Sequence, residues 1–363
     1  MYTVKVKLNK RSYNIIIGNN IMGLLGKYLK RLSIGNYAYV ITNSSVKNKY
    51  GRILDKGLKD YGFQVKFRLT PDTEKSKSIE MSATLIKDIA HFDKKKRIFI
   101  IAFGGGVIGD LAGFVASIYK RGVNYIQIPT TLLAQVDSSI GGKTAVDLTV
   151  GKNLVGAFYQ PRLVFSDINF LKTLDLRQTK SGIAEVIKYA LINDSSLFNY
   201  LGKHYKDILS KKGPNLEFIV RRCSLIKAKI VSQDEREEKG IRTILNFGHT
   251  IGHAIEAAGD FKRYTHGEAV AVGMLVASDI SMSLGLINSK TLQSIEKIIK
   301  SFGLPTKIKK SYLVDIIEAH FYDKKFIGPK NRFVLIEDIG KTKILENIPL
   351  RIVKEALIKR AVT

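Results

Sequence analysis

The first hundred residues alternate between two hydrophobic periodicities, and this alternation restricts the fold more than any other feature of the chain. Short runs rich in β-branched and aromatic residues predict strands at 2–8, 13–17, 37–42, 63–68 and 97–103. Segments with helical spacing of apolar residues separate them and predict helices at 20–31, 46–61 and 78–92. Strands that alternate with helices form a mostly parallel sheet covered on both faces. We therefore predict an N-terminal α/β domain with a doubly wound sheet that binds ligands beyond the carboxyl ends of its strands.

A glycine turn follows the strand predicted at 97–103. Residues 104–110 read GGGVIGD and contain the spacing G-x-G-x-x-G. Glycines let the backbone approach a pyrophosphate, and the N-terminus of a following helix stabilises its charge. The turn does not follow the first strand, and no acidic residue lies about 20 residues later to hold a ribose. We interpret it as a phosphate-cradling turn of a nucleotide site; a tight turn without a ligand is the alternative.

Two further glycine turns carry lysines. After a strand that ends at Pro129, residues 137–145 read DSSIGGKTA and place Lys143 behind a glycine pair. Residues 151–153 read GKN and add Lys152. A lysine beside glycine can contact a phosphate or a carboxylate, and a solvated loop lysine is the alternative.

Helical periodicity dominates after residue 170. It predicts helices at 182–191, 215–232, 243–258, 268–284, 289–302 and 313–321, with one strand at 332–336. We place the domain boundary there, so that residues 1–170 form an α/β domain and residues 171–363 an all-α domain. The cleft between the two halves is the expected place for the chemistry.

Three of the six histidines lie close together in the C-terminal half. His249 and His253 are four residues apart, so on a helix they project from one face, and His266 opens the next predicted helix. Neutral imidazole is a common zinc ligand. The chain has a single cysteine, Cys223, so any metal ligands must be His, Asp or Glu. The spacing and the nearby acids predict a metal site; core or capping histidines are the alternative.

The net charge of +27 fits either nucleic acid or a small anionic ligand as the partner. The lysines are scattered, no aromatic residues are interleaved with them, and no finger, basic-zipper or RNP motif is present. We therefore disfavour nucleic-acid binding as the primary function. The N-terminus resembles no signal peptide, and no uninterrupted apolar stretch is long enough to span a bilayer. A cytoplasmic protein without membrane attachment is expected.

The ordered motifs resemble those of the 3-dehydroquinate synthases over nearly the whole chain. The resemblance is carried by residues 104–113, 127–145, 151–161, 181–189, 245–256, 266–274 and 323–325. Members of that family are typically homodimers that use NAD+ and one zinc or cobalt ion. They are cyclising carbon–oxygen lyases that convert 3-deoxy-D-arabino-heptulosonate 7-phosphate to 3-dehydroquinate and phosphate, in the shikimate pathway to chorismate and the aromatic amino acids. The resemblance implies the same fold here, with a Rossmann-like NAD-binding domain over residues 1–170 and an all-α metal- and substrate-binding domain over residues 171–363. It also implies the same activity, cofactors and homodimer.

The resemblance also implies roles for individual residues. The metal ligands become Glu185, His249 and His266, in place of the set suggested by histidine spacing. The residues implied to act in catalysis are Asp137, Lys143, Lys188, Glu238, Asn246 and His253. Those implied to bind the substrate are Arg121, which would reach into the partner subunit's site, Asn153, Lys227, Arg242 and Lys325. NAD+ would be held by Asp72, Glu74, Lys77, Gly106, Val107, Ile108, Gly109, Asp110, Thr130, Thr131, Lys143, Lys152, Phe170, Leu171, Lys172, Thr173 and Ser181.

The sequence departs from the family pattern in two places. Residues 72–74 read Asp-Thr-Glu where Asp-Gly-Glu is commoner, and the segment 234–240 is one residue longer than usual. Either Glu237 or Glu238 therefore matches the acid/base glutamate, and either Lys324 or Lys325 matches a substrate lysine.

Two other enzyme functions remain as alternatives. Another sugar phosphate cyclase, such as a 2-deoxy-scyllo-inosose synthase, acts on a substrate without a carboxylate and would not need Lys227 and Arg242. A metal-dependent polyol dehydrogenase would not need the run of phosphate ligands.

Overall fold

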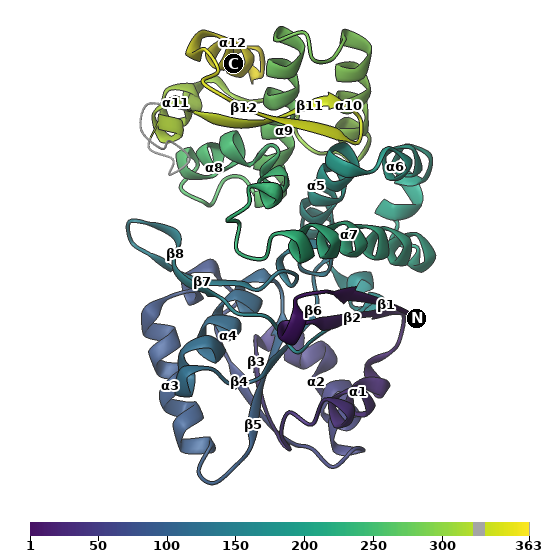
Figure 1. The fold of residues 1–363 in the computed structure, drawn as a ribbon, viewed down its shortest axis with the longest axis vertical. Coiled ribbons are helices and arrows are strands. Elements are labelled where there is room, and N and C mark those ends of the chain that lie inside the picture. Colours follow the sequence, from purple (N-terminus) through teal and green to yellow (C-terminus); the bar gives the residue numbers. More distant parts are fainter. Residues whose placement is uncertain (322–330, 363) are drawn as a thin grey trace. The chain divides into compact units, whose positions relative to one another are not determined.

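The computed structural model describes residues 1–321 and 331–362, and the chain divides into two compact units (Figure 1). The first comprises Met1–Leu174 and Leu216–Arg236, and the second comprises Asp175–Asn215 and Glu237–Thr363. We predicted one boundary near residue 170. In the structure the first unit ends at Leu174, and it also includes most of helix α7 (Gly213–Gln233), which comes later in the chain. Helix α7 belongs to the first unit because its Lys227 and Ser232 form hydrogen bonds with residues of that unit.

A seven-stranded sheet forms the centre of the first unit (Figure 1). Its order is β1–β2–β9–β6–β5–β3–β4, and only β1 is antiparallel to its neighbour. This confirms the mostly parallel, doubly wound sheet. Strand β9, buried throughout, was not predicted. The strands are β1 (Tyr2–Val6), β2 (Tyr13–Gly18), β3 (Tyr37–Thr42), β4 (Gln64–Leu69), β5 (Ile98–Gly104), β6 (Tyr125–Pro129) and β9 (Leu163–Asp167).

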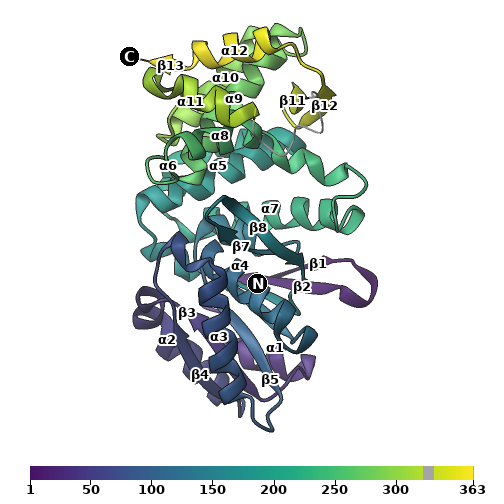
Figure 2. The same cartoon turned by 90° about the vertical axis from the view of Figure 1, so that its left-hand side faces the viewer.

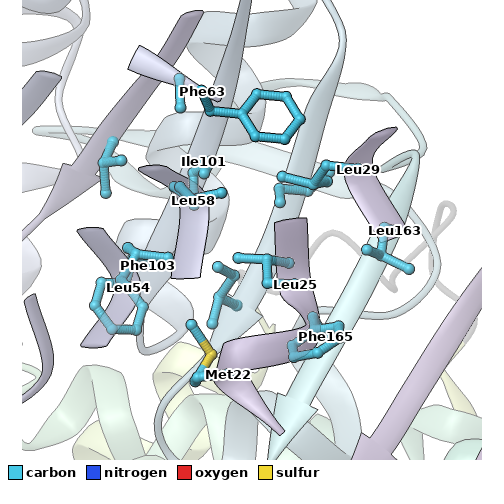
Figure 3. Close-up of a cluster of buried hydrophobic side chains, with 14 of the residues drawn as sticks. Met22, Leu25, Leu29, Leu54, Leu58, Phe63, Ile101, Phe103, Leu163 and Phe165 are labelled. Atoms are coloured by element: carbon cyan, nitrogen blue, oxygen red, sulfur yellow. The ribbon is translucent and has the colours of Figure 1, made fainter. Parts of the chain in front are cut away.

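Helices cover both faces of this sheet. Helices α1 (Leu25–Leu32) and α2 (Ser44–Lys59) pack on one face, and α3 (Ile79–Phe92) and α4 (Gly106–Ile118) pack on the other. Figure 3 shows the first face, where leucines of α1 and α2 lie against aromatic and aliphatic side chains of the strands. Strand β5 divides its side chains between the two clusters by simple alternation, as a strand buried on both sides must.

A hairpin replaces the two predicted lysine-bearing turns. Strand β7 (Lys143–Leu148) pairs antiparallel with β8 (Gly151–Phe158). We expected loops at Lys143, Lys152 and Asn153, but the structure places these residues on the two strands. The turn that contains Gly141 and Gly142 ends before Lys143, where β7 begins. The paired backbone fixes these side chains more firmly than a loop would.

Helices dominate the second unit, as predicted. Helix α9 lies at its centre, where α5, α8, α10 and α12 contact it (Figure 2). The sequence did not predict α6, α12 or strand β12, which pairs with β11. A two-residue parallel pair, β10 (Ile308–Lys309) with β13 (Ala361–Val362), joins the C-terminus to this unit. The other elements are α5 (Leu176–Asn193), α6 (Ser195–Leu209), α8 (His249–Ala258), α9 (His266–Ser283), α10 (Ser289–Ser301), α11 (Leu313–Phe321), β11 (Arg332–Asp338), β12 (Lys341–Glu346) and α12 (Leu350–Lys359).

The helix predicted at 243–258 is split in the structure. A 3₁₀ turn over Ile241–Asn246 is followed by α8, and Gly248 stands between them with φ of +77°. Glycine adopts this left-handed conformation without the steric cost that other residues bear. The break gives α8 its own first residue, His249. Among the described residues, no helix is long and apolar enough to cross a membrane.

An ion-pair network attaches the C-terminal residues to α9 and α10. Asp279 of α9 accepts hydrogen bonds from Arg360 Nε at 2.5 Å and from Lys359 Nζ at 2.7 Å. Glu296 of α10 accepts one from Arg360 Nη1 at 2.7 Å. Asp279 and Arg360 are buried, so the pair holds the end of the chain against the unit.

The pKa of Glu296 makes part of this attachment sensitive to acid. Hydrogen bonds from Lys300 and Arg360 lower the pKa of Glu296 to about 2. A lowered folded-state pKa contributes stability that is full above the ordinary value near 4.5 and is lost as pH falls toward 2. We expect Glu296→Gln to lower the free energy of unfolding at neutral pH by about 1 kcal/mol, because solvent screens this partly exposed group. Denaturant titrations should show the difference from wild type vanishing over that acid window; a constant difference would contradict the assignment.

Candidate functional site

Three donor atoms converge in the second unit. Glu185 comes from α5, His249 is the first residue of α8, and His266 is the first residue of α9. Glu185 Oε1 lies 3.5 Å from His249 Nε2 and 3.3 Å from His266 Nε2, and the donor atoms all lie within 4.8 Å of one another. One buried carboxylate and two imidazoles fit a zinc or cobalt ion and leave positions open for a substrate, as in catalytic sites.

The other ring nitrogen of each imidazole faces a hydrogen-bond acceptor. His249 Nδ1 lies 3.1 Å from the carbonyl oxygen of Phe247, and His266 Nδ1 lies 3.2 Å from Glu256 Oε2. Carbonyl and carboxylate oxygens only accept, so Nδ1 carries the hydrogen in both bonds. A neutral ring then keeps its lone pair on Nε2, which is the atom turned toward Glu185. This protonation pattern fits metal ligation.

The carboxylates of Glu185 and Glu256 raise the pKa of the His266 imidazole. Burial alone would favour the neutral ring, but hydrogen bonds to Glu185 and Glu256 outweigh it and raise the pKa of His266 to about 10. A metal ion that binds here displaces the second proton. The same carboxylates that hold this proton would attract a divalent cation.

The first turn of α9 is tied to α5. Thr265 and Glu268 form a capping box, and Arg177 of α5 binds both carboxylate oxygens of Glu268 at 2.9 and 3.1 Å. The amide of Gly267 donates to Ser181 Oγ at 3.1 Å. These contacts flank His266. Ser181, for which the resemblance implied a cofactor contact, is used here as a hydrogen-bond acceptor within the scaffold of the metal-ligand cluster.

His253 lies beside the same cluster and is exposed. Its ring centroid is 5.4 Å from that of His249 and 6.3 Å from that of His266. His253, Glu256 and His266 form a second group whose donor atoms gather within 4.8 Å. The histidines chosen by spacing are therefore close together, although Glu185 completes the more buried group.

Charged side chains surround these ligands in the second unit. Lys188, one helical turn after Glu185, forms a buried ion pair with Glu185 Oε2. Arg242 is buried in the 3₁₀ turn, and its Nε lies 3.5 Å from Glu237 Oε1. Glu238 is exposed, so the structure brings Glu237, of the two glutamates left open by the sequence, to Arg242. Asn246 ends the same turn two residues before Gly248.

A second set of predicted substrate residues lies in the first unit. Lys227 Nζ donates to the carbonyl oxygen and to Oδ1 of Asp137, both at 2.8 Å. Asp137 belongs to a π-helical turn over Ala134–Ser138, and Lys143 stands exposed at the start of β7. These three side chains thus come from three different elements, namely helix α7, the π-helical turn and strand β7.

Arg121 lies in a strained turn after α4. Lys120 and Arg121 have φ of +48° and +63°, and Gly122 follows with φ of +125°. A left-handed conformation costs a non-glycine residue about 1–2 kcal/mol. The strain is confined to an exposed turn that presents Arg121 to its surroundings.

The glycine turn between β5 and α4 is closely lined. A Cβ on Gly105 would lie 3.1 Å from Thr131, one on Gly106 would lie 3.1 Å from Ser138 Oγ, and one on Gly109 would lie 2.9 Å from Gln127 Oε1. The first amides of a helix have no intrahelical partner and can bind an anion. Larger residues at these three glycines would crowd neighbouring side chains. The free amides at the start of α4 fit the pyrophosphate of a dinucleotide.

Lys77 links this turn to the hairpin. Its Nζ donates to Asp110 Oδ2 at 2.9 Å and to Asn153 Oδ1 at 2.5 Å, and lies 3.8 Å from Asp147 Oδ1 and 3.7 Å from Glu74 Oε1. The side chain is only 4% exposed. The resemblance implied that Lys77 contacts NAD+, and this stays a prediction; in the structure its ammonium faces four protein oxygens. Lys77 therefore joins the 3₁₀ turn at Glu74–Ser76, helix α4 and the β7–β8 hairpin.

The remaining predicted cofactor residues also belong to the first unit. Asp72 Oδ1 accepts from Asn43 Nδ2 at 2.7 Å, and Lys152 Nζ lies 3.8 Å from Glu74 Oε1. Thr130 and Thr131 follow β6, while Phe170, Leu171, Lys172 and Thr173 belong to a 3₁₀ segment over Ile168–Thr173. Lys325, and its alternative Lys324, lie outside the described residues.

The sequence did not single out Glu256 or Asp147. Glu256 follows His249 by seven residues, which is about two helical turns, so helical spacing alone could have placed it near the histidines. Asp147 had no such signal, because its contact with Lys77 depends on the unpredicted hairpin.

Comparisons with known proteins agree with these observations. Family models described as 3-dehydroquinate synthase N-terminal and C-terminal match residues 68–181 and 182–326. A 3-dehydroquinate synthase from Thermoanaerobacter pseudethanolicus is 44% identical over 341 residues, which cover 94% of this chain and 96% of that protein. One from Clostridium acetobutylicum is 44% identical over 340 residues, which cover 94% and 95%.

Solved structures show the same fold. A 2-deoxy-scyllo-inosose synthase in complex with carbaglucose-6-phosphate, NAD+ and Co2+ has a TM-score of 0.90 and 27% identity, with 99% of this chain and all of that chain covered. A 2-epi-5-epi-valiolone synthase from Streptomyces hygroscopicus with NAD+ and Zn2+ has a TM-score of 0.87 and 24% identity, with 96% of each chain covered. A probable glycerol dehydrogenase from Sinorhizobium meliloti shares the fold more distantly, with a TM-score of 0.63 and 16% identity over 95% of each chain.

Proposed function

The chain belongs to the 3-dehydroquinate synthase family, and we propose that the residues described above carry out that family's reaction. The enzyme converts 3-deoxy-D-arabino-heptulosonate 7-phosphate to 3-dehydroquinate and phosphate and serves the shikimate pathway. It is a cyclising carbon–oxygen lyase that depends on NAD+ and one divalent ion, zinc or cobalt. The observation that carries the residue assignment is the convergence of Glu185, His249 and His266 on one point.

The reaction removes phosphate next to a carbon whose proton is not acidic in the substrate. Transient oxidation of a neighbouring carbinol makes that proton acidic, so phosphate leaves by β-elimination; re-reduction and an intramolecular aldol closure follow. When bound, the metal ion supplies Lewis acidity and NAD+ accepts and returns a hydride. Glu185, His249 and His266 are the proposed ligands of the ion. The glycine turn at Gly106–Asp110 is the proposed seat of the cofactor's pyrophosphate.

The chain's own charges suit this substrate. A phosphate monoester brings a charge of about −1.5 to −2 near neutral pH, and the substrate carboxylate adds another. We assign phosphate and hydroxyl contacts to Asp137, Lys143, Asn153, Lys188 and Asn246. His253, exposed beside the ligand imidazoles, is assigned to hold or transfer a proton at the phosphate. Two cations, Lys227 and Arg242, are assigned to the carboxylate.

Of the two glutamates in the longer segment, we assign Glu237 to acid/base work. Its carboxylate lies 3.5 Å from Arg242 Nε, whereas Glu238 is exposed. The resemblance left Glu237 and Glu238 open, and the choice of Glu237 over Glu238 rests on the contact with Arg242. Glu237→Gln should therefore lower kcat more than Glu238→Gln does.

Arg242→Lys is expected to lower kcat/KM by about 10- to 100-fold, mainly through a higher KM. Lysine keeps the charge but lacks the planar fork that grips a carboxylate with two parallel hydrogen bonds. Steady-state phosphate release measures the effect. Arg351→Lys is the matched control, since that side chain is 85% exposed. An unchanged kcat/KM for Arg242→Lys would remove Arg242 from the substrate site.

The function is tested with the purified protein, the heptulosonate phosphate, NAD+ and Zn2+. We expect equal amounts of phosphate and dehydroquinate, no net NADH, and loss of turnover with a chelator. Net NADH would indicate a polyol dehydrogenase instead. Phosphate release from glucose 6-phosphate, which lacks a carboxylate, would indicate the neighbouring cyclase activity.

We also propose that the enzyme is a cytoplasmic homodimer in which Arg121 serves the partner's site. The exposed, strained turn at Lys120–Gly122 supports this, since strained backbone of this kind gathers at functional positions. Sedimentation should give about twice the chain mass of 40.6 kDa. A monomeric, fully active protein would contradict the assignment of Arg121.

A further inference from the structure

Glu256 occupies a place that the proposed mechanism leaves unexplained. It lies on α8, is only 7% exposed, and its Oε2 is 3.2 Å from His266 Nδ1. The opposite nitrogen of the same ring, Nε2, lies 3.3 Å from Glu185 Oε1. The imidazole of His266 is thus held between carboxylates from α5 and α8.

We propose that Glu256 is a positioning residue that fixes the tautomer and the orientation of His266 for the metal ion. This inference rests on the ligand set given under the proposed function. A carboxylate that accepts the Nδ1 hydrogen leaves the lone pair of the neutral ring on Nε2 and raises its basicity. Loss of such a partner typically weakens metal binding by about 10- to 100-fold.

The two ligand imidazoles differ in what supports them. His249 Nδ1 faces a neutral backbone carbonyl of the residue two positions earlier, which the left-handed Gly248 helps to place. His266 Nδ1 faces a charged side chain from another helix. Both histidines are the first residues of their helices, so the two rings differ in their Nδ1 partners and not in their place on a helix. The orientation of the His266 ring therefore depends on a side chain, whereas that of His249 depends on the backbone.

Charge balance in the buried cluster supports the same role. Glu185 is shared, because its Oε2 already pairs with the ammonium of Lys188. A divalent cation together with Lys188 would leave two positive charges in excess of the one carboxylate. Glu256 reduces that excess at a distance of one imidazole ring. Buried charge is costly unless it is compensated in this way.

A competing role for Glu256 is direct ligation of an ion, together with His253 and His266. That group would use Nδ1 of His266, and a neutral imidazole has only one lone pair to give. An ion there would therefore compete with one bound by Glu185 and His249. The competing role predicts that His253 contributes to zinc affinity, whereas the positioning role predicts that it does not.

The test compares the affinity of the purified protein for Zn2+ by competition with a chelator, and the visible absorption of the Co2+ form. Five single variants are used: Glu256→Ala, Glu256→Gln, Glu185→Gln, His253→Ala and the exposed control Glu355→Gln. We expect Glu256→Ala to weaken zinc binding 10- to 100-fold and to shift the Co2+ bands. Glu256→Gln should fall between wild type and Glu256→Ala, since its amide oxygen can still accept the Nδ1 hydrogen.

Each outcome has one meaning. Glu185→Gln without loss of zinc affinity would refute the proposed ligand set itself. Loss in Glu185→Gln with wild-type affinity and spectrum in Glu256→Ala would refute only the positioning role. A loss in His253→Ala equal to that in Glu256→Ala would assign Glu256 to its own ion. Circular dichroism and NAD+ affinity check that the variants are folded.

Discussion

Substituting Glu185 by glutamine is expected to lower kcat/KM by on the order of 1000-fold, which corresponds to about 4 kcal/mol of transition-state stabilisation. Glutamine preserves the shape of the side chain but removes the charge that faces both imidazoles. A neutral amide is a poor ligand for a zinc-like ion compared with a carboxylate. The loss should therefore appear first as weak zinc binding and, in consequence, as lost turnover.

The same substitution removes the carboxylate that offsets the buried ammonium of Lys188. Breaking a buried ion pair costs about 3–5 kcal/mol. The variant Glu185→Gln/Lys188→Met should recover part of that stability and none of the activity. Phosphate release, zinc content and denaturant unfolding measure the three effects, with Glu355→Gln, 60% exposed, as the control. Normal turnover in zinc-loaded Glu185→Gln would refute Glu185 as a ligand.

Gly273→Ala is the second change with a large expected effect. Helix α9 approaches α8 so closely at this point that a Cβ on Gly273 would lie 2.9 Å from the Gly252 amide nitrogen, and closer still to the Gly248 carbonyl oxygen. These neighbours are backbone atoms and cannot rotate away. The two helices must then move apart, which costs about 1–3 kcal/mol as overpacking. Because α8 begins with His249 and α9 with His266, we also expect zinc affinity to fall at least about 10-fold.

Gly202→Ala is the matched control. Gly202 lies within α6, and a Cβ there would have nothing within 4 Å apart from its chain neighbours and the nearby backbone of its own helix. Alanine is favoured over glycine inside a helix by about 0.5–1 kcal/mol, so this variant should gain stability. Opposite signs for the two substitutions in thermal unfolding would confirm that α8–α9 contact, not helix propensity, decides the result. Equal signs would contradict it.

Local patterns were enough to predict the sheet of the first unit. Strands such as β3 and β5 carry unbroken apolar runs, and helices such as α2 and α3 have clear periodicity and polar caps at Asn43 and Ser78. The hairpin β7–β8 has one exposed face and neither signal, so its residues were taken for loops. Strand β9 is five residues long, and its place between β2 and β6 depends on pairing that spacing cannot reveal.

The metal-ligand cluster shows most clearly what local sequence patterns could not predict. Histidine spacing selected a segment whose imidazoles lie close together in the structure, but Glu185 lies 64 residues before His249 and on another helix. Helical periodicity relates residues within one element only, so it could not select this carboxylate; the family resemblance did. The helical spacing also did not predict the left-handed conformation of Gly248, because the spacing continues across the break between the 3₁₀ turn and α8.

The buried ammonium of Lys77 has a thermodynamic consequence. Asp110 on α4, a proposed cofactor residue, and Asn153 on the hairpin, a proposed substrate residue, both accept a hydrogen from the same ammonium nitrogen. A ligand that draws either residue away from Lys77 would therefore change the charge that the other residue faces. Reciprocity then requires that NAD+ strengthen or weaken the binding of the heptulosonate phosphate by the same factor that the phosphate exerts on NAD+. The affinities for cofactor and substrate would then be linked through the one ammonium group that binds both residues.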